Sequence, residues 1–152
     1  MKGLKRKIQK AYEDHGFGFP VTLLNVPMVE ARGELVPDVN QNELQKRVIE
    51  ALAFKPSRLT GSEVHFIRLF SSMTLVQFAS RLDVTHPAVL KWEKRGSKTT
   101  GMSWSTEKDI RLFALLKINA GRGQFVAAYN GFEHVFPDAH RQIKIDLEKQ
   151  SA

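Results

Sequence analysis

The sequence predicts a mainly α-helical fold with a small β part near the N-terminus. Several segments between residues 40 and 118 begin with helix-capping residues and continue with apolar residues at helical spacing. Residues 20–37 instead contain β-branched and aliphatic side chains on either side of a short turn signal. The chain has 152 residues, of which 42% are hydrophobic, so it is long enough for one ordinary domain or two small ones.

The N-terminal segment predicts a basic tail followed by a β-hairpin. Residues 1–10 are rich in lysine and arginine and contain no acid, which is typical of a frayed helix or a disordered arm. Residues 20–37 predict two strands that are interrupted at residues 31–33. Because Pro27 has no backbone N–H, we expect the first strand to be an edge strand or a broken one.

Asn40 marks the start of a helix that ends at Lys55 and Pro56. Asn40 followed by Glu43 is a capping signature. The apolar residues that follow fall on one helical face: Leu44, Val48, Ala51 and Leu52. We interpret residues 1–57 as a small α+β module formed by the hairpin and this helix.

Three short helices are expected next, each with its own start signal. Their capping residues are Thr60, Thr74 and Thr85. Glu63 completes a capping box with Thr60. Pro87 lies in the first turn of the third helix, where a missing N–H costs nothing, and Gly96 ends that helix.

The second and third of these helices, joined by a short turn, have the sequence form of a helix-turn-helix. The residues expected to bury the inner faces are Phe78, Ala79, Val84, Val89 and Trp92. The outward face of the third helix carries His86, Pro87, Leu90, Lys91 and Lys94. That face is available to the edges of bases in a DNA groove, and the helix N-termini can point free amides at phosphates.

The remaining residues predict a further helix and a terminal strand. Ser105 or Thr106 is expected to start a helix that runs to about Ile118. A short helix is expected around residues 125–129, and the strict alternation of QIKIDLE predicts a strand around residues 143–147. We therefore treat residues 58–118 as a helix-turn-helix domain and residues 119–152 as a C-terminal extension.

The charge of the chain favours an acidic partner. The formal net charge is +7, and residues 58–117 account for +5 of it, with ten lysines and arginines against five acids. The densest group of cations consists of Lys91, Lys94, Arg95 and Lys98, opposed only by Glu93. Its position on the expected helix-turn-helix gives this group a geometry suited to DNA.

Other chemistries have little support in the sequence. The absence of cysteine excludes disulfides and thiolate-bound zinc or iron–sulfur sites. His134 and His140 lack the spacing of a metal-binding pair, and Arg122 between two glycines lacks the Lys-Ser/Thr of a phosphate-binding P-loop. No serine lies in a nucleophile elbow, so we expect no enzyme activity, no metal and no cofactor.

Location follows from what the sequence lacks. No apolar run approaches the roughly 20 residues that cross a bilayer, and the N-terminus lacks the apolar stretch of a signal peptide. We therefore expect a cytoplasmic, nucleoid-associated protein with no membrane partner.

The string MTLVQFASRLDVTHPAVLKWEKRG, which starts at Met73, resembles the Xre/Cro-type helix-turn-helix of lambda-repressor-like domains. The resemblance covers roughly residues 59–117. It implies base reading by Thr85, His86, Pro87 and Lys91. It also implies contacts to the DNA backbone from Thr74 and Gln77, to which the basic residues Lys94 and Arg95 add phosphate contacts.

The same resemblance implies a structural ion pair between Glu93 and Arg68. Two positions depart from the family pattern. Asp83 replaces the usual glycine of the turn, although aspartate tolerates a left-handed backbone better than most residues. Leu75 replaces a frequent glutamine, which removes one expected polar contact and puts the base preference at that step in doubt.

The order of hairpin, helix and helix-turn-helix resembles the layout of MqsA-type antitoxins, in which the first module binds a toxin and the second binds the operator. That family holds its first module with cysteine-ligated zinc, and this chain has no cysteine. The module either packs through residues such as Leu23, Val26 and Val36, or the similarity is coincidental. HigA-type antitoxins also carry the Xre-like domain without zinc.

Two functional hypotheses follow from these resemblances. In the first, the protein is a homodimeric operator-binding repressor that also neutralises a toxin and regulates its own operon. In the second, it is a stand-alone transcription regulator whose N-terminal part serves dimerisation or sensing. A module that has lost DNA binding is a third reading, which the retained Lys91, Lys94 and Arg95 disfavour. The terminal strand and the helix ending near Ile118 are candidate dimer surfaces.

Overall fold

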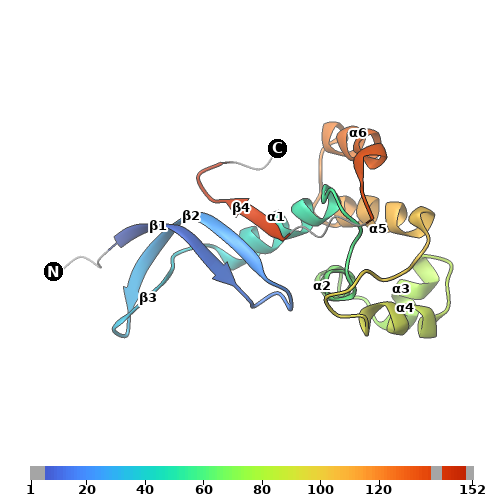
Figure 1. The fold of residues 1–152 in the computed structure, drawn as a ribbon, viewed down its shortest axis with the longest axis horizontal. Helices are drawn as coiled ribbons and strands as arrows, with labels where there is room; N and C mark the ends of the chain where they lie inside the picture. The colour runs from blue at the N-terminus through green and yellow to red at the C-terminus, as the bar shows by residue number, and fades with distance from the viewer. Residues whose placement is uncertain (1–5, 138–141, 150–152) are drawn as a thin grey trace.

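A computed structural model describes residues 6–137 and 142–149 of the chain (Figure 1). It is 47% helical and 22% strand, with a four-stranded mixed sheet and six α-helices. The predicted class, mainly α with a small β part, is therefore wrong, because the sheet is larger than the expected hairpin. The three N-terminal strands form one end of the molecule and the helices that follow residue 60 form the other, with the helix Gln41–Ala53 and the strand Ile143–Asp146 between them (Figure 1).

The sheet is built around one long central strand. β2 (Val21–Ala31) pairs antiparallel with β1 (Arg6–Asp14) along most of its length. On its other side, β2 pairs antiparallel with β3 (Glu34–Pro37) near one end and parallel with β4 (Ile143–Asp146) near the other. The two halves of that second edge thus come from opposite ends of the chain.

The basic opening of the chain, expected as a tail, contributes to a strand. Its residues 6–10 belong to β1, whereas residues 1–5 lie outside the described residues. Arg6 lies opposite Val29 and Asp14 opposite Val21, so this segment owes its structure to a partner strand. Lysines are common on edge strands because they discourage pairing with a second molecule, and a cation-rich segment can therefore still be a strand. This addition enlarges the β part.

A further correction concerns Pro27, which lies in the central strand and not at an edge. Its carbonyl oxygen accepts a hydrogen bond from the Asp38 backbone N–H at 2.7 Å. Within a strand the N–H and C=O of one residue point to the same side, so the missing N–H also faces Asp38. Asp38 follows the last residue of β3, and the sheet therefore loses no ladder hydrogen bond there.

Four of the predicted helix starts are confirmed. The side chains of Asn40, Thr60, Thr74 and Thr85 each accept a backbone hydrogen bond at the start of a helix. These caps open α1 (Gln41–Ala53), α2 (Gly61–Phe70), α3 (Leu75–Arg81) and α4 (His86–Glu93). Capping is a local property, which is why sequence alone predicts it.

The C-terminal elements differ in extent from the prediction. α5 (Trp104–Lys117) is capped by Ser103, earlier than the expected Ser105 or Thr106. α6 (Arg122–Gly131) is longer than the expected residues 125–129 and leads into a short 3-10 helix, η1 (Phe132–His134). The terminal strand is present as β4, where Ile143 and Ile145 are buried, so this strand is an internal part of the fold and not a free dimer surface.

The main hydrophobic core contains residues from all three segments that the sequence suggested. It joins Val21 and Leu23 of the sheet to Phe78 of the helix-turn-helix and to Ile143 of the terminal strand. Leu23 and Val26 are fully buried, whereas Val36 is half-buried. A smaller cluster joins α5 and α6 through Leu115, Ala128 and Phe132. The divisions at residues 57 and 118 therefore do not separate independent cores.

None of the helices in the described parts of the chain combines the length and the apolar character needed to cross a membrane.

Candidate nucleic-acid interface

α3 is positioned by a reciprocal capping box. The Thr74 hydroxyl accepts a hydrogen bond from the Gln77 backbone N–H at 3.1 Å, and the Gln77 side-chain oxygen accepts from the Thr74 N–H at 3.0 Å. Both residues are exposed. Phe78 and Ala79 face the opposite way and are buried. The exposed start of α3 thus carries two polar side chains, Thr74 and Gln77, at the positions expected to meet a DNA backbone.

The turn between α3 and α4 depends on a left-handed residue. Asp83 has a φ of 56°, which is the conformation that the sequence suggested aspartate would tolerate here. The next backbone N–H, of Val84, reaches back to the Ala79 carbonyl at 3.0 Å. Because Ala79 is small and only 2% exposed, the two helices can cross closely at this point.

α4 has one buried side and one exposed side. Val89 is fully buried and Trp92 is 9% exposed, so these residues hold the helix against the core. The exposed side chains are His86, Pro87, Leu90, Lys91 and Lys94. Thr85 caps the helix through a 3.3 Å hydrogen bond from Ala88, and Pro87 sits in the first turn. All the residues expected to read bases are therefore at the surface.

Cations gather at the end of α4 and in the loop behind it. Lys91, Lys94, Arg95 and Lys98 are all exposed. Arg95 donates a hydrogen bond to the Thr99 carbonyl at 3.1 Å, which restrains its side chain. A shallow depression of about 400 Å³ is lined by residues of this group together with Pro87 and Leu90. The only acid within this stretch, Glu93, is neutralised from the other side.

Arg68 of α2 and Glu93 of α4 form a bidentate ion pair. The Arg68 Nε lies 2.7 Å from Glu93 Oε2, and Nη2 lies 2.9 Å from Oε1. Arg68 also donates to the Met73 carbonyl at 2.9 Å, and His65 contacts the same carboxylate. The Arg68 side chain is 11% exposed and the Glu93 side chain 7%, so the pair is mostly but not completely shielded from water. The partners that the resemblance implied are thus brought together.

The ion pair changes the pKa of both groups. The hydrogen bond to Glu93 raises the pKa of Arg68 against the opposing effect of burial. Burial alone would raise the pKa of Glu93, but the hydrogen bonds from Arg68 and His65 outweigh it and hold this pKa below its usual value. Glu93 therefore stays ionised and paired, and the exposed cations of α4 keep their positive field.

Backbone contacts from α2, which the sequence did not suggest, also fix the end of α4. Gly61 donates a hydrogen bond to the Lys98 carbonyl at 3.1 Å, and Ser62 donates to the Gly96 carbonyl at 2.9 Å. A glycine at the first residue of a helix gives no sign in the sequence of such a close approach. Only the packing of α2 against α4 shows why this residue is small.

A second unpredicted feature is a buried ionic network behind the helix-turn-helix. Arg111 of α5, 1% exposed, donates to the carbonyls of Lys55 and Ser57 at 2.6 Å each and pairs with Glu107 at 2.8 Å. Arg58 binds the other oxygen of Glu107 at 2.8 Å. The (i, i+4) spacing of Glu107 and Arg111 is the feature of the sequence from which this ion pair could have been predicted. The network ties α5 to the segment that links α1 with α2.

Comparisons with protein-family models, with curated proteins and with solved structures gave no match. The functional assignment therefore depends on the geometry of α3 and α4.

The structure offers no metal-binding cluster in the residues it describes: these contain no group of three or more His, Asp or Glu side chains placed to hold an ion. His134 lies in η1, and His140 lies outside the described residues. Arg122 begins α6 and is exposed. Neither His134 nor Arg122 belongs to the surface formed by α3 and α4.

Proposed function

We propose that this protein is a sequence-specific DNA-binding transcription repressor in which α4 enters the major groove. The observation that carries the proposal is the two-sidedness of α4. Val89 and Trp92 anchor one side in the core, while His86 and Lys91 stand exposed on the other. A recognition helix needs both sides, because its base-reading groups must be rigidly held from behind.

The exposed groups of α4 divide into two chemical roles. His86 and Lys91 present ring nitrogens and an ammonium to the hydrogen-bonding atoms of base edges, and the ring of Pro87 offers an apolar contact to a thymine methyl. These contacts choose the sequence.

Lys94 and Arg95, with the exposed Thr74 and Gln77 at the start of α3 and the cap residue Thr85, suit phosphate oxygens. These contacts supply affinity that depends on salt but not on sequence.

A single domain of this kind reads too few base pairs to be selective, so the active form is a homodimer. Two-fold symmetry places both copies of α4 in successive major grooves, roughly 34 Å apart. With β4 incorporated into the sheet, the exposed part of α5, which includes Leu116, is the better candidate for the dimer surface. A repressor of this kind works in the cytoplasm, in association with the nucleoid.

The antitoxin role is a finer proposal that rests on the sheet. Alternation along β2 buries Val26 and Met28 against the helices and turns Pro27 and Val29 to the opposite face. Ile8, opposite Pro27, is 57% exposed on that face. A sheet face with an exposed Ile8 beside the half-buried Pro27 and Val29 fits a protein partner such as a toxin. The alternative is a stand-alone regulator that uses the same face to dimerise.

The test of DNA binding is the retention of genomic fragments on filters by the purified full-length protein. We expect a small set of fragments that share a two-fold symmetric motif, retained in preference to bulk DNA. A protein that ignores DNA at low salt would overturn the proposal. Co-expression with the neighbouring reading frame separates the two finer roles, because an antitoxin must relieve the toxicity of its partner and a stand-alone regulator need not.

A further inference from the structure

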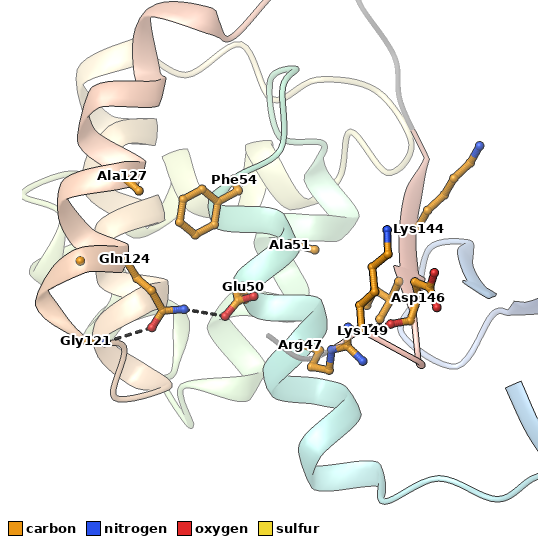
Figure 2. A pocket seen from close by; sticks show the side chains of 12 residues that line it. Arg47, Glu50, Ala51, Phe54, Gly121, Gln124, Ala127, Lys144, Asp146 and Lys149 are labelled. Carbon is orange, nitrogen blue, oxygen red and sulfur yellow. Dashed lines mark hydrogen bonds between the residues drawn. The ribbon is translucent and has the colours of Figure 1, made fainter. Parts of the chain in front are cut away.

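A groove of about 830 Å³ lies between α6 and β4, with α1 as its floor (Figure 2). Arg47, Glu50 and Ala51 of α1 and Phe54, the residue that follows this helix, line the groove at a spacing that places them on one side. The groove is far from α4 in the sequence and shares none of its lining with the surface formed by α3 and α4. Its size falls within the range of small-molecule sites.

One side of the groove is apolar and open. Phe54, which is 38% exposed, and Ala127 of α6 face the space between the two helices (Figure 2). Gly121 and Gly123 also border it, and a Cβ added to either would meet no atom within 4 Å. An exposed aromatic ring beside small residues leaves room for the flat or branched body of an apolar ligand.

The other side of the groove carries cations. Arg47 and Lys149 lie near each other beside β4, and Lys144 extends outward from that strand (Figure 2). Arg47 donates to the Asp146 carbonyl at 2.9 Å, which holds its guanidinium at the rim. In the part of the chain that the structure describes, the ammonium groups of Lys144 and Lys149 make no hydrogen bond or ion pair.

The two acids that line the groove, Asp146 and Glu50, are hydrogen-bonded within the protein. Asp146 accepts hydrogen bonds from Asn25 at 2.9 Å and from the Glu148 backbone N–H at 3.0 Å. These bonds, with the nearby charges of Lys149 and Arg47, hold the pKa of Asp146 below its usual value, so it stays ionised. Glu50 accepts a hydrogen bond from Gln124 at 2.6 Å. Among the residues that line the groove, Arg47, Lys144 and Lys149 outnumber the two acids, so the groove keeps a net positive charge.

We propose that this groove binds a small amphipathic anion, with an aromatic or branched apolar body and one acidic head group. The body lies against Phe54, Ala127 and the glycines, and the head group pairs with Lys144 and Lys149. Separation of apolar surface and cations to opposite sides is the complement of such a molecule. The site stands whether or not α4 binds DNA, since the two surfaces share no residue.

The site also lies where the two parts of the fold meet. Phe54 directly precedes Lys55, whose carbonyl is held by Arg111 of α5. α6 packs on α5, and β4 belongs to the sheet. A ligand in the groove therefore contacts elements of the sheet and of the helical part at once.

The probe for this site is anilinonaphthalene sulfonate, an amphipathic anion whose fluorescence rises in apolar surroundings. We expect saturable binding of one probe per chain to the full-length protein. A Cβ at Gly123 meets no atom within 4 Å, so Gly123→Trp adds a large ring at the groove and should weaken binding at least about tenfold, equivalent to about 1.4 kcal/mol. Val126→Trp is the matched control, because Val126 lies on the same helix, is 50% exposed and does not line the groove.

The role of the charges is tested with a neutral probe of the same shape, N-phenylnaphthylamine. The double variant Lys144→Gln with Lys149→Gln should weaken the anionic probe about tenfold and change the neutral probe by less than about twofold. Lys46→Gln, on α1 but outside the groove, should change neither. Circular dichroism of each variant verifies that the fold is kept.

Four outcomes overturn the proposal. The first is the absence of saturable probe binding by the wild-type protein, and the second is equal binding by Gly123→Trp and Val126→Trp. Equal loss of both probes in the lysine variant removes recognition of the anionic head group. Displacement of the probe on raising the protein concentration, with a larger sedimenting species, shows that the groove is covered by a second copy of the chain.

Discussion

Gly61 and Trp92 lie in direct backbone contact. A Cβ placed on Gly61 would be 2.3 Å from the carbonyl oxygen of Trp92 and 2.8 Å from the backbone nitrogen of Gly96. The start of α2 thus packs directly against the end of α4. This close approach is possible because Gly61 has no Cβ methyl group. The same helix α2 supplies Arg68, so both of its contacts to α4 set how far the recognition face projects.

Gly61→Ala should therefore destabilise the protein. The added methyl must push against rigid backbone, which costs about 1–3 kcal/mol and lowers the melting temperature by several degrees. Gly123→Ala is the control, because a Cβ there meets nothing and alanine favours a helix. Calorimetric melting of the two variants compares them directly. Equal melting temperatures would mean that α2 shifts freely over α4.

Lys91→Ala should impair recognition more than general affinity for DNA. If Lys91 donates to a base edge, its loss costs about 1–3 kcal/mol at the selected operator and much less on random DNA. Binding isotherms on both kinds of duplex measure the difference, with Lys46→Ala as a control on a helix remote from α4. Equal losses on the two duplexes would reassign Lys91 to a phosphate.

The salt dependence of binding should fall when phosphate contacts are removed. Lys94→Ala combined with Arg95→Ala should reduce the slope of log K against log salt by about 2, since each phosphate contact contributes about 0.9. Sequence preference should change little. Titrations of the operator at several salt concentrations give the slope. A slope equal to that of the wild type would place both side chains away from the DNA.

Arg68→Ala should lower stability more than it alters sequence preference. It leaves the half-buried Glu93 with His65 as its remaining side-chain partner, at a cost of about 2 kcal/mol. The double variant Arg68→Met with Glu93→Leu should recover part of this loss, because no charge is then left unpaired. Melting temperatures of the single and double variants test the pair. An unchanged value for Arg68→Ala would show that the pair adds nothing to stability.

Glu93 should also make stability depend on acidity. Its pKa in the folded protein lies below the ordinary value of 4.5, so the unfolded chain binds a proton more readily than the folded one. The stabilisation is therefore complete above about pH 4.5 and is lost as pH falls through the lower folded pKa. Glu93→Gln should lose part of the difference in melting temperature between pH 7 and pH 3.5. A variant with the full wild-type difference would contradict the assignment.

The helix starts were predictable because their causes are local. Asn40, Thr60, Thr74 and Thr85 each bind a backbone N–H three residues ahead, and a reader of the sequence sees both partners at once. The left-handed turn at Asp83 and the burial of Trp92 follow from the same short segment. The candidate site residues of α3 and α4 come from the resemblance of this same segment to Xre/Cro-type domains, and their side chains are exposed in the structure.

Long-range pairing was decided only in three dimensions. β1 exists because Arg6 lies opposite Val29, and β4 because Ile143 lies beside Val21. The sequence of β1 or β4 does not show which strand it will pair with. The lysine-rich residues 6–10 therefore had the pattern of a tail, and Pro27 had the pattern of an edge residue. The contact between α4 and Gly61 and the groove between α6 and β4 are likewise formed by segments that are distant in the sequence. Side-chain chemistry acts over a few residues, whereas contacts between distant segments depend on how the whole core packs.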